Sequence, residues 1–239
     1  MRNYLVLALA LFLLSSCDYF SGTRVRGDGN VVAQSRTVDG FSGVDVSGAI
    51  EVVVREDAAY SVKVETDNNL QEYVEVHNEG GILRIHNRNR FRLVPSRRLI
   101  VYVAGPGLTS FSASGACKIK SENKITATSP VDIDATGASG IHLDVNAPSV
   151  DVSLSGASSA SLKGETKELS ISSSGSSDVN AFELLSENTD VDVSGAGNAE
   201  VFASVKLEAE GSGASKIRYK GNASVSSNTS GASTVQKVN

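Results

Sequence analysis

Six arginines within fifteen residues form the densest group of charged side chains of one sign in this 239-residue sequence. They occur in the segment LRIHNRNRFRLVPSRRL and are Arg84, Arg88, Arg90, Arg92, Arg97 and Arg98. A guanidinium group binds a carboxylate, sulfate or phosphate through two parallel hydrogen bonds. The segment is therefore the candidate anion-binding site, with an anionic glycan or a lipid head group as its expected partner. The alternative is a solvated loop that joins two strands.

Aspartates form a second group, because they recur at the alternate polar positions of strand-like segments. The group consists of Asp132, Asp134, Asp151, Asp190 and Asp192. Paired carboxylates carry out glycoside hydrolysis, and some parallel β-helices degrade polysaccharides. However, serines occupy the equivalent positions of other segments, which indicates solvent-facing sites, and the chain has no Trp to stack on a sugar ring. We therefore expect a protein that is not an enzyme and has no catalytic residue.

Neither a metal site nor a cofactor is expected. The histidines His77, His86 and His142 do not lie in a short ligand pattern with another histidine or a cysteine. The acidic pairs show no calcium-loop signature. Cys117 takes the place of a small residue in a repeated phrase, which indicates a filler. The formal net charge of −5 gives no argument for nucleic-acid binding.

The N-terminal stretch MRNYLVLALALFLLSSC has the layout of a secretory signal. A positive start is followed by an apolar run too short for a comfortable membrane span, and then by small residues. Its last four residues resemble a bacterial lipobox, in which the cysteine receives a diacylglyceryl group. The alternative is an ordinary signal peptide with an incidental cysteine. We expect a signal peptide over residues 1–16, lipidation at Cys17, a polar tether over residues 17–39, and anchoring in the outer membrane of the cell envelope.

A phrase of the type Ser-Gly-Ala-Ser recurs through the second half of the chain. Its glycines are Gly115, Gly137, Gly156, Gly175, Gly195, Gly213 and Gly231, with spacings of 22, 19, 19, 20, 18 and 18. Apolar residues alternate with polar ones on both sides of each glycine, which is typical of strands with one buried face. A strand, a corner and a second strand cannot bury that face alone, but stacked copies can. Residues 111–239 are therefore predicted to form a parallel β-helix-like solenoid with rungs of roughly 19 residues.

The preceding region, residues 40–110, lacks this regular spacing of glycines. It contains strand-like runs such as VDVSGAIEVVV, YSVKVE and LIVYV, separated by turn signals. We predict a longer-stranded N-terminal β lobe. The lobe either forms wider rungs of the same stack or caps its first end, because open strand edges invite aggregation.

Taken together, these segments resemble one bacterial family, which is described as the putative auto-transporter adhesin, head GIN domain, known mainly from Bacteroidetes lipoproteins. The resemblance rests on FSGVDVSGAIEVVV, YSVKVETDNNLQEYVEVH, LIVYVAGPGLTSFSASGA and the rungs that follow, and it covers residues 38–239. It implies one all-β, β-helix-like domain on an envelope lipoprotein that acts in adhesion. We expect a non-enzymatic lipoprotein that presents a solenoid interaction surface. The alternative is a β-helix protein that binds or degrades polysaccharide.

Overall fold

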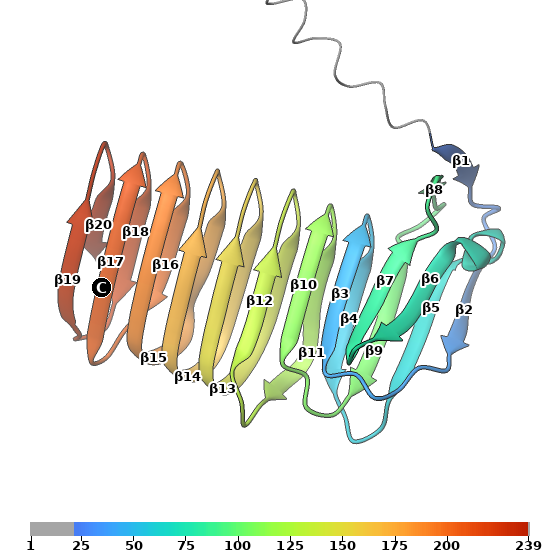
Figure 1. Ribbon diagram of the computed structural model, residues 1–239, viewed down its shortest axis with the longest axis horizontal. Coiled ribbons are helices and arrows are strands. Elements are labelled where there is room, and N and C mark those ends of the chain that lie inside the picture. Colours follow the sequence, from blue (N-terminus) through green and yellow to red (C-terminus); the bar gives the residue numbers. More distant parts are fainter. Residues whose placement is uncertain (1–21, 239) are drawn as a thin grey trace, which may run out of the picture.

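The computed structural model describes residues 22–238 as an elongated stack of β-strands (Figure 1). The first part contains β1 (Thr23–Arg26), β2 (Val31–Arg36), β3 (Gly43–Gly48), β4 (Glu51–Glu56), β5 (Ser61–Asp67), the 3₁₀-helix η1 (Asn68–Tyr73), β6 (Val74–Glu79), β7 (Ile82–Asn87), β8 (Phe91–Val94) and β9 (Ile100–Gly105). The second part contains β10 (Ser110–Gly115), β11 (Lys118–Thr126), β12 (Val131–Ala135), β13 (Gly140–Leu154), β14 (Ser159–Ser173), β15 (Asp178–Gly195), β16 (Asn198–Phe202), β17 (Lys206–Gly213), β18 (Lys216–Lys220), β19 (Ser224–Thr229) and β20 (Thr234–Lys237).

The second part is a β-solenoid, as the sequence predicts. Strands that precede each corner glycine pair in parallel to form a first face: β10, β12, the later halves of β13, β14 and β15, then β17 and β19. Strands that follow each corner pair in parallel to form a second face, which includes β11, β16, β18 and β20. Apolar residues stack in register inside, as in Val131 opposite Val150. The core therefore lies between two parallel sheets.

Each corner requires glycine for two reasons. At Gly156 the backbone has a φ of +83°, a region that residues with a side chain rarely adopt. A Cβ atom there would also lie 2.8 Å from the carbonyl oxygen of Gly137 in the rung before. That carbonyl accepts a hydrogen bond of 2.8 Å from the N–H of Ala157. The repeated phrase thus builds a column of glycines joined by backbone hydrogen bonds.

Hydroxyl groups line the inside of this column. The Oγ of Ser158 donates to a backbone carbonyl at 3.0 Å and lies 3.3 Å from the Oγ of Ser177 in the next rung. Cys117 occupies the same position in an earlier rung and is 2% exposed. Buried hydroxyls need such partners. The small polar residues of the phrase therefore have a structural role.

The region 40–110 continues the stack and also closes it. β3 pairs in parallel with β10, which places Gly48 opposite Gly115. Beyond β3 and β4 lies the terminal rung, formed by β7 and β9. Antiparallel β5 and β6 then pair with these strands, and β2 pairs with β5. The spacing of about 19 residues is absent here because β5, η1 and β6, which close the end of the stack, lie in the sequence between the β3–β4 rung and the β7–β9 rung.

The described part of the expected tether is folded. β2 pairs with β5 and β1 pairs with β8, so residues 23–26 and 31–36 are strands. Asp67 is buried and accepts hydrogen bonds of 2.8 Å from the N–H groups of Gly29 and Ser96. These bonds hold the turn between β1 and β2 against the body, which explains why this polar stretch is ordered. Within residues 22–238, the structure contains no helix long and apolar enough to cross a membrane.

Candidate functional site

The arginine-rich segment is an enlarged corner of the terminal rung. In the neighbouring rung two residues separate Gly48 from the next strand, which begins at Glu51. The β3–β7 ladder ends at Val46 opposite Ile85, and two residues further on Asn87 lies beside Gly48, while Ile100 pairs with Glu51. Residues 88–99 therefore replace a two-residue corner. They leave the rung and form β8, which pairs in parallel with β1.

Three of the six predicted arginines are neutralised by carboxylates. Arg84 lies on the first face and forms ion pairs with Asp45 and Glu79. Arg88 contacts Glu75 at 3.1 Å. Arg98 contacts Glu51 at 3.1 Å, and Glu51 also binds Lys120 at 2.7 Å. The Lys120 hydrogen bond is the main reason why the pKa of Glu51 is lowered; burial opposes it and Arg98 assists.

The other three arginines are exposed and form no ion pair within the described part of the chain. They are Arg90, Arg92 and Arg97. The structure adds two more exposed arginines, Arg24 and Arg26 of β1, which the sequence analysis assigned to the tether. Arg24 lies directly opposite Arg92 in the ladder. The alternation of Thr23-Arg24-Val25-Arg26 was the sequence signal for this strand.

We call β1 and β8 together the arginine ribbon. Its inner side is apolar: the rings of Phe91 and Tyr73 lie 4.7 Å apart between centroids, and Leu93 packs on the core. Because side chains alternate across a strand, Arg24, Arg26 and Arg92 share the outer side. Arg90 has a φ of +72° and its carbonyl accepts a 2.7 Å hydrogen bond from Thr23. This bond joins the two strands of the ribbon at its start.

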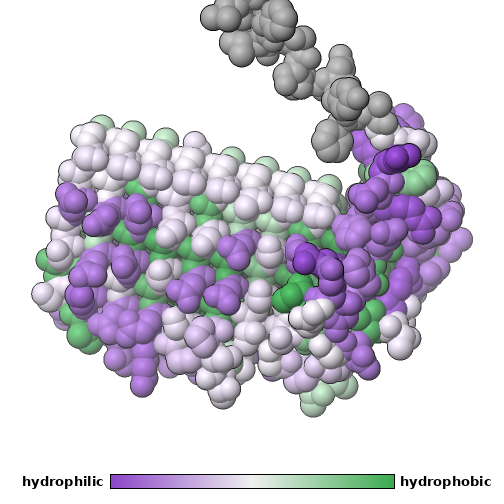
Figure 2. Space-filling model, in the orientation of Figure 1, coloured by the Kyte–Doolittle hydropathy of each residue, from purple (hydrophilic) through white to green (hydrophobic). Residues whose placement is uncertain are grey.

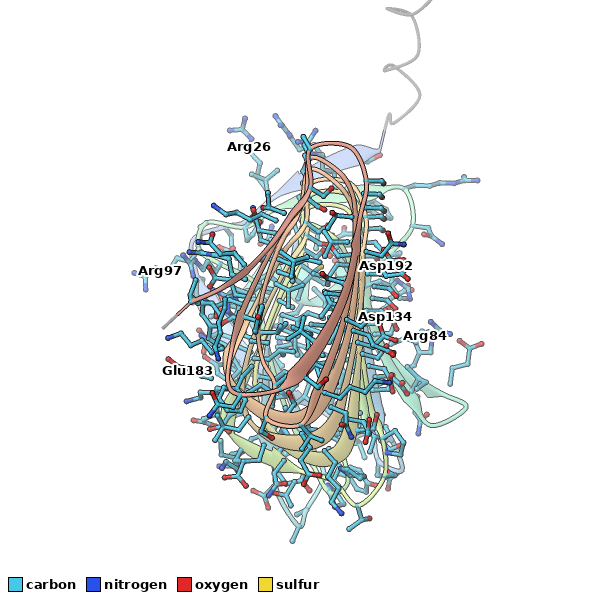
Figure 3. The ribbon with its side chains drawn as sticks, turned by 90° about the vertical axis from the view of Figure 1, so that its left-hand side faces the viewer. Arg26, Arg84, Arg97, Asp134, Glu183 and Asp192 are labelled. Atoms are coloured by element: carbon cyan, nitrogen blue, oxygen red, sulfur yellow. The ribbon has the colours of Figure 1, made fainter. Side chains whose placement is uncertain are left out.

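The predicted aspartates share the first face, on the side away from Arg97 (Figure 3). Asp132 pairs in register with Asp151, and Asp190 and Asp192 pair with Glu208 and Glu210. Burial raises the pKa of Asp134, and the nearby charge of Asp132 raises it further. Among residues 22–238, no group of three His, Cys, Asp or Glu side chains is arranged to hold a metal ion. The face is therefore a row of carboxylates and hydroxyls on an open sheet.

A family comparison places this architecture among known proteins. Residues 40–223 match the family described as the putative auto-transporter adhesin, head GIN domain. The match covers more than half of the chain, so the chain belongs to this family, which confirms the resemblance seen in the sequence. No curated protein matches the chain in sequence.

Solved structures share the fold at low identity. A putative adhesin from Bacteroides fragilis is 17% identical, with a TM-score of 0.84 over 90% of this chain and 100% of that chain. One from Parabacteroides merdae is 20% identical, with a TM-score of 0.76 over 91% and 100%. A putative lipid binding protein from Parabacteroides distasonis is 18% identical, with a TM-score of 0.74 over 91% and 100%. These likenesses support the fold of the whole described chain.

Proposed function

We propose that this protein is a non-enzymatic, lipid-anchored adhesin of the cell envelope that presents its solenoid as an interaction surface. The observation that carries the proposal is the outer side of the first face. From β10 to β19 its outward positions hold serine, aspartate, glutamate or asparagine, except for Lys206 of β17, which pairs with Glu208 at 2.7 Å. With strands about 4.8 Å apart, these rows form a long, open, polar surface. Such a surface suits contact with an extended partner, whereas an enzyme site is usually concave.

The anchor belongs to the same proposal. Cys17 and the lipobox-like residues before it lie outside the described residues. The first described strand begins at Thr23, six positions after Cys17. Two acyl chains hold a protein stably on a membrane without a spanning helix. Attachment there would fix the closed end of the stack near the membrane and leave the first face free.

The anchor is tested by the substitution Cys17→Ala in cells fed a labelled fatty acid. We expect the wild type to be labelled and to partition into detergent, and the variant to lose both properties. Labelling that survives the substitution rejects the lipobox. Protease treatment of intact cells then tests for display on the cell surface, since only an exposed solenoid is cleaved without lysis.

Adhesion is tested on the first face. The variant Asp192→Asn with Glu210→Gln removes two neighbouring charges of the acidic row. We expect cells that display it to adhere less well than wild-type cells. The control variant Lys163→Gln changes an exposed residue of the second face and should leave adhesion unchanged. Equal adhesion of all three strains would show that the first face is not the adhesive surface.

Polysaccharide binding or cleavage is the second candidate function. Asp134 favours it, because its raised pKa is a property of general acids and Asp132 and Asp151 lie on the same face. Incubation of the purified protein with acidic and neutral polysaccharides separates the two functions. New reducing ends that disappear in Asp134→Asn would establish an enzyme and overturn the adhesin proposal.

A further inference from the structure

We propose that the arginine ribbon docks on the anionic head groups of the membrane that holds the anchor. The inference rests on the proposed function, because it takes the lipid at Cys17 as the reason why a membrane lies nearby. It assigns the unpaired arginines to phospholipid phosphate and thereby gives the solenoid a defined orientation on the bilayer.

Charge at the ribbon is not compensated by any carboxylate of residues 22–238. Arg24 and Arg92 are direct neighbours in the ladder, and like charges in that arrangement repel each other. No carboxylate of the described residues lies within ion-pair distance of Arg24, Arg26, Arg90 or Arg92, whereas Arg84, Arg88 and Arg98 are all paired. This concentration occurs in a chain whose net charge is −5. An external anion is therefore the natural counter-charge.

The ribbon is a preformed surface. Backbone hydrogen bonds join its two strands to each other at both ends, from the Thr23 N–H to the Arg90 carbonyl and from the Gly27 N–H to the Val94 carbonyl at 3.0 Å. Its apolar side faces the body, so the guanidinium groups point outward. β1 and β8 stand beyond the line of corners at the closed end of the stack (Figure 1). Hydrophilic residues cover much of this end, although a further group lies toward the opposite end of the stack (Figure 2).

Chain length favours a membrane over a soluble glycan as the partner. Six residue steps connect Cys17 to Thr23. A fully extended chain spans at most about 3.6 Å per residue, so a lipid at Cys17 keeps β1 within about 22 Å of the head groups. Long arginine side chains close part of that distance. An anionic membrane surface attracts each nearby basic residue strongly enough to change binding about fivefold.

The test uses the chain without its signal peptide and with Cys17→Ala, so that no lipid contributes. Co-sedimentation is measured with vesicles of phosphatidylcholine alone and of phosphatidylcholine mixed with phosphatidylglycerol. We expect binding only to the mixed vesicles, and weaker binding at physiological salt, because exposed charges are screened over about 8 Å. Since this protein cannot be acylated, the result is independent of whether Cys17 is a lipidation site.

The variant Arg24→Ser with Arg92→Ser should bind the mixed vesicles about 25-fold more weakly, from two basic residues at about fivefold each. The matched control Lys167→Ser with Lys237→Ser removes the same charge from exposed sites outside the ribbon and should bind like the parent. The variant Arg24→Lys with Arg92→Lys keeps the charge and should retain binding, which separates a docking role from a folding role.

Three results overturn the proposal. The first is the absence of binding to the mixed vesicles at low salt. The second is equal binding by the serine variant and the parent. The third is retention on heparin-like or polygalacturonate matrices that depends on Arg24 and Arg92, without binding to the mixed vesicles, which would assign the ribbon to an anionic glycan instead.

Discussion

The glycine column allows a direct test of how one rung supports the next. We compare Gly156→Ala with Gly107→Ala, because both glycines have a positive φ, +83° and +63°. A Cβ atom at position 107 meets nothing within 4 Å, whereas at position 156 it would lie 2.8 Å from the carbonyl oxygen of Gly137. The first substitution therefore adds a clash to the backbone strain, and the second adds strain alone.

The expected magnitudes follow from these two terms. A residue with a side chain in the left-handed region costs about 1–2 kcal/mol. Alanine also restricts the unfolded chain, which offsets about 0.4–1 kcal/mol of that cost. Gly107→Ala should therefore destabilise by about 1 kcal/mol. At Gly156 the clash adds about 1–3 kcal/mol for overpacking, and a weakened hydrogen bond from Ala157 to Gly137 adds about 1 kcal/mol.

The measurement is hydrogen exchange in the native state, because stacked repeats need not unfold in a single step. In Gly156→Ala we expect faster exchange at Ala157, which bonds to the Gly137 carbonyl, and at Ser176, which bonds to the Gly156 carbonyl. Gly107→Ala should leave both amides protected. Equal destabilisation by the two substitutions, or a change at Ala157 alone, would refute the idea that the corners support one another.

Two further predictions concern buried groups. Asp67→Asn should destabilise the closed end by about 1–3 kcal/mol at neutral pH, because it weakens the bonds from Gly29 and Ser96. Burial raises the pKa of Asp67, but those hydrogen bonds outweigh it, so the pKa in the folded protein is lowered. The contribution of Asp67 to the free energy of unfolding is therefore complete above the pKa of the unfolded carboxyl and is lost as pH falls through the lowered value. The stability of the variant in urea should accordingly depend less on pH in the acid range. Burial raises the pKa of the Cys117 thiol, so a maleimide should label it only as the stack opens; fast labelling of the folded protein would contradict this burial.

Much of the solenoid could be predicted because its information is local. The alternation around Gly137, Gly156 and Gly175 identifies strands and corners without reference to distant residues. Stacking follows because each unit has an apolar face that only a neighbouring copy can cover. The sharing of one face by Asp132, Asp134 and the other predicted aspartates follows from the same alternation, and the structure confirms the all-β stack.

The closed end was decided by pairings between distant residues. Nothing local places Arg24 opposite Arg92, or shows that Arg98 is neutralised by Glu51 while Arg92 is not. The order of the first rungs also depends on tertiary structure, because β3 pairs with β10 on one side and with β7 on the other. The sequence by itself therefore determined the repeating rung, because the alternation of apolar and polar residues and the position of each glycine are properties of residues close together in the chain. Only the folded chain decided which arginines form no ion pair among residues 22–238, because ion pairs form between side chains that the backbone brings together from separate strands.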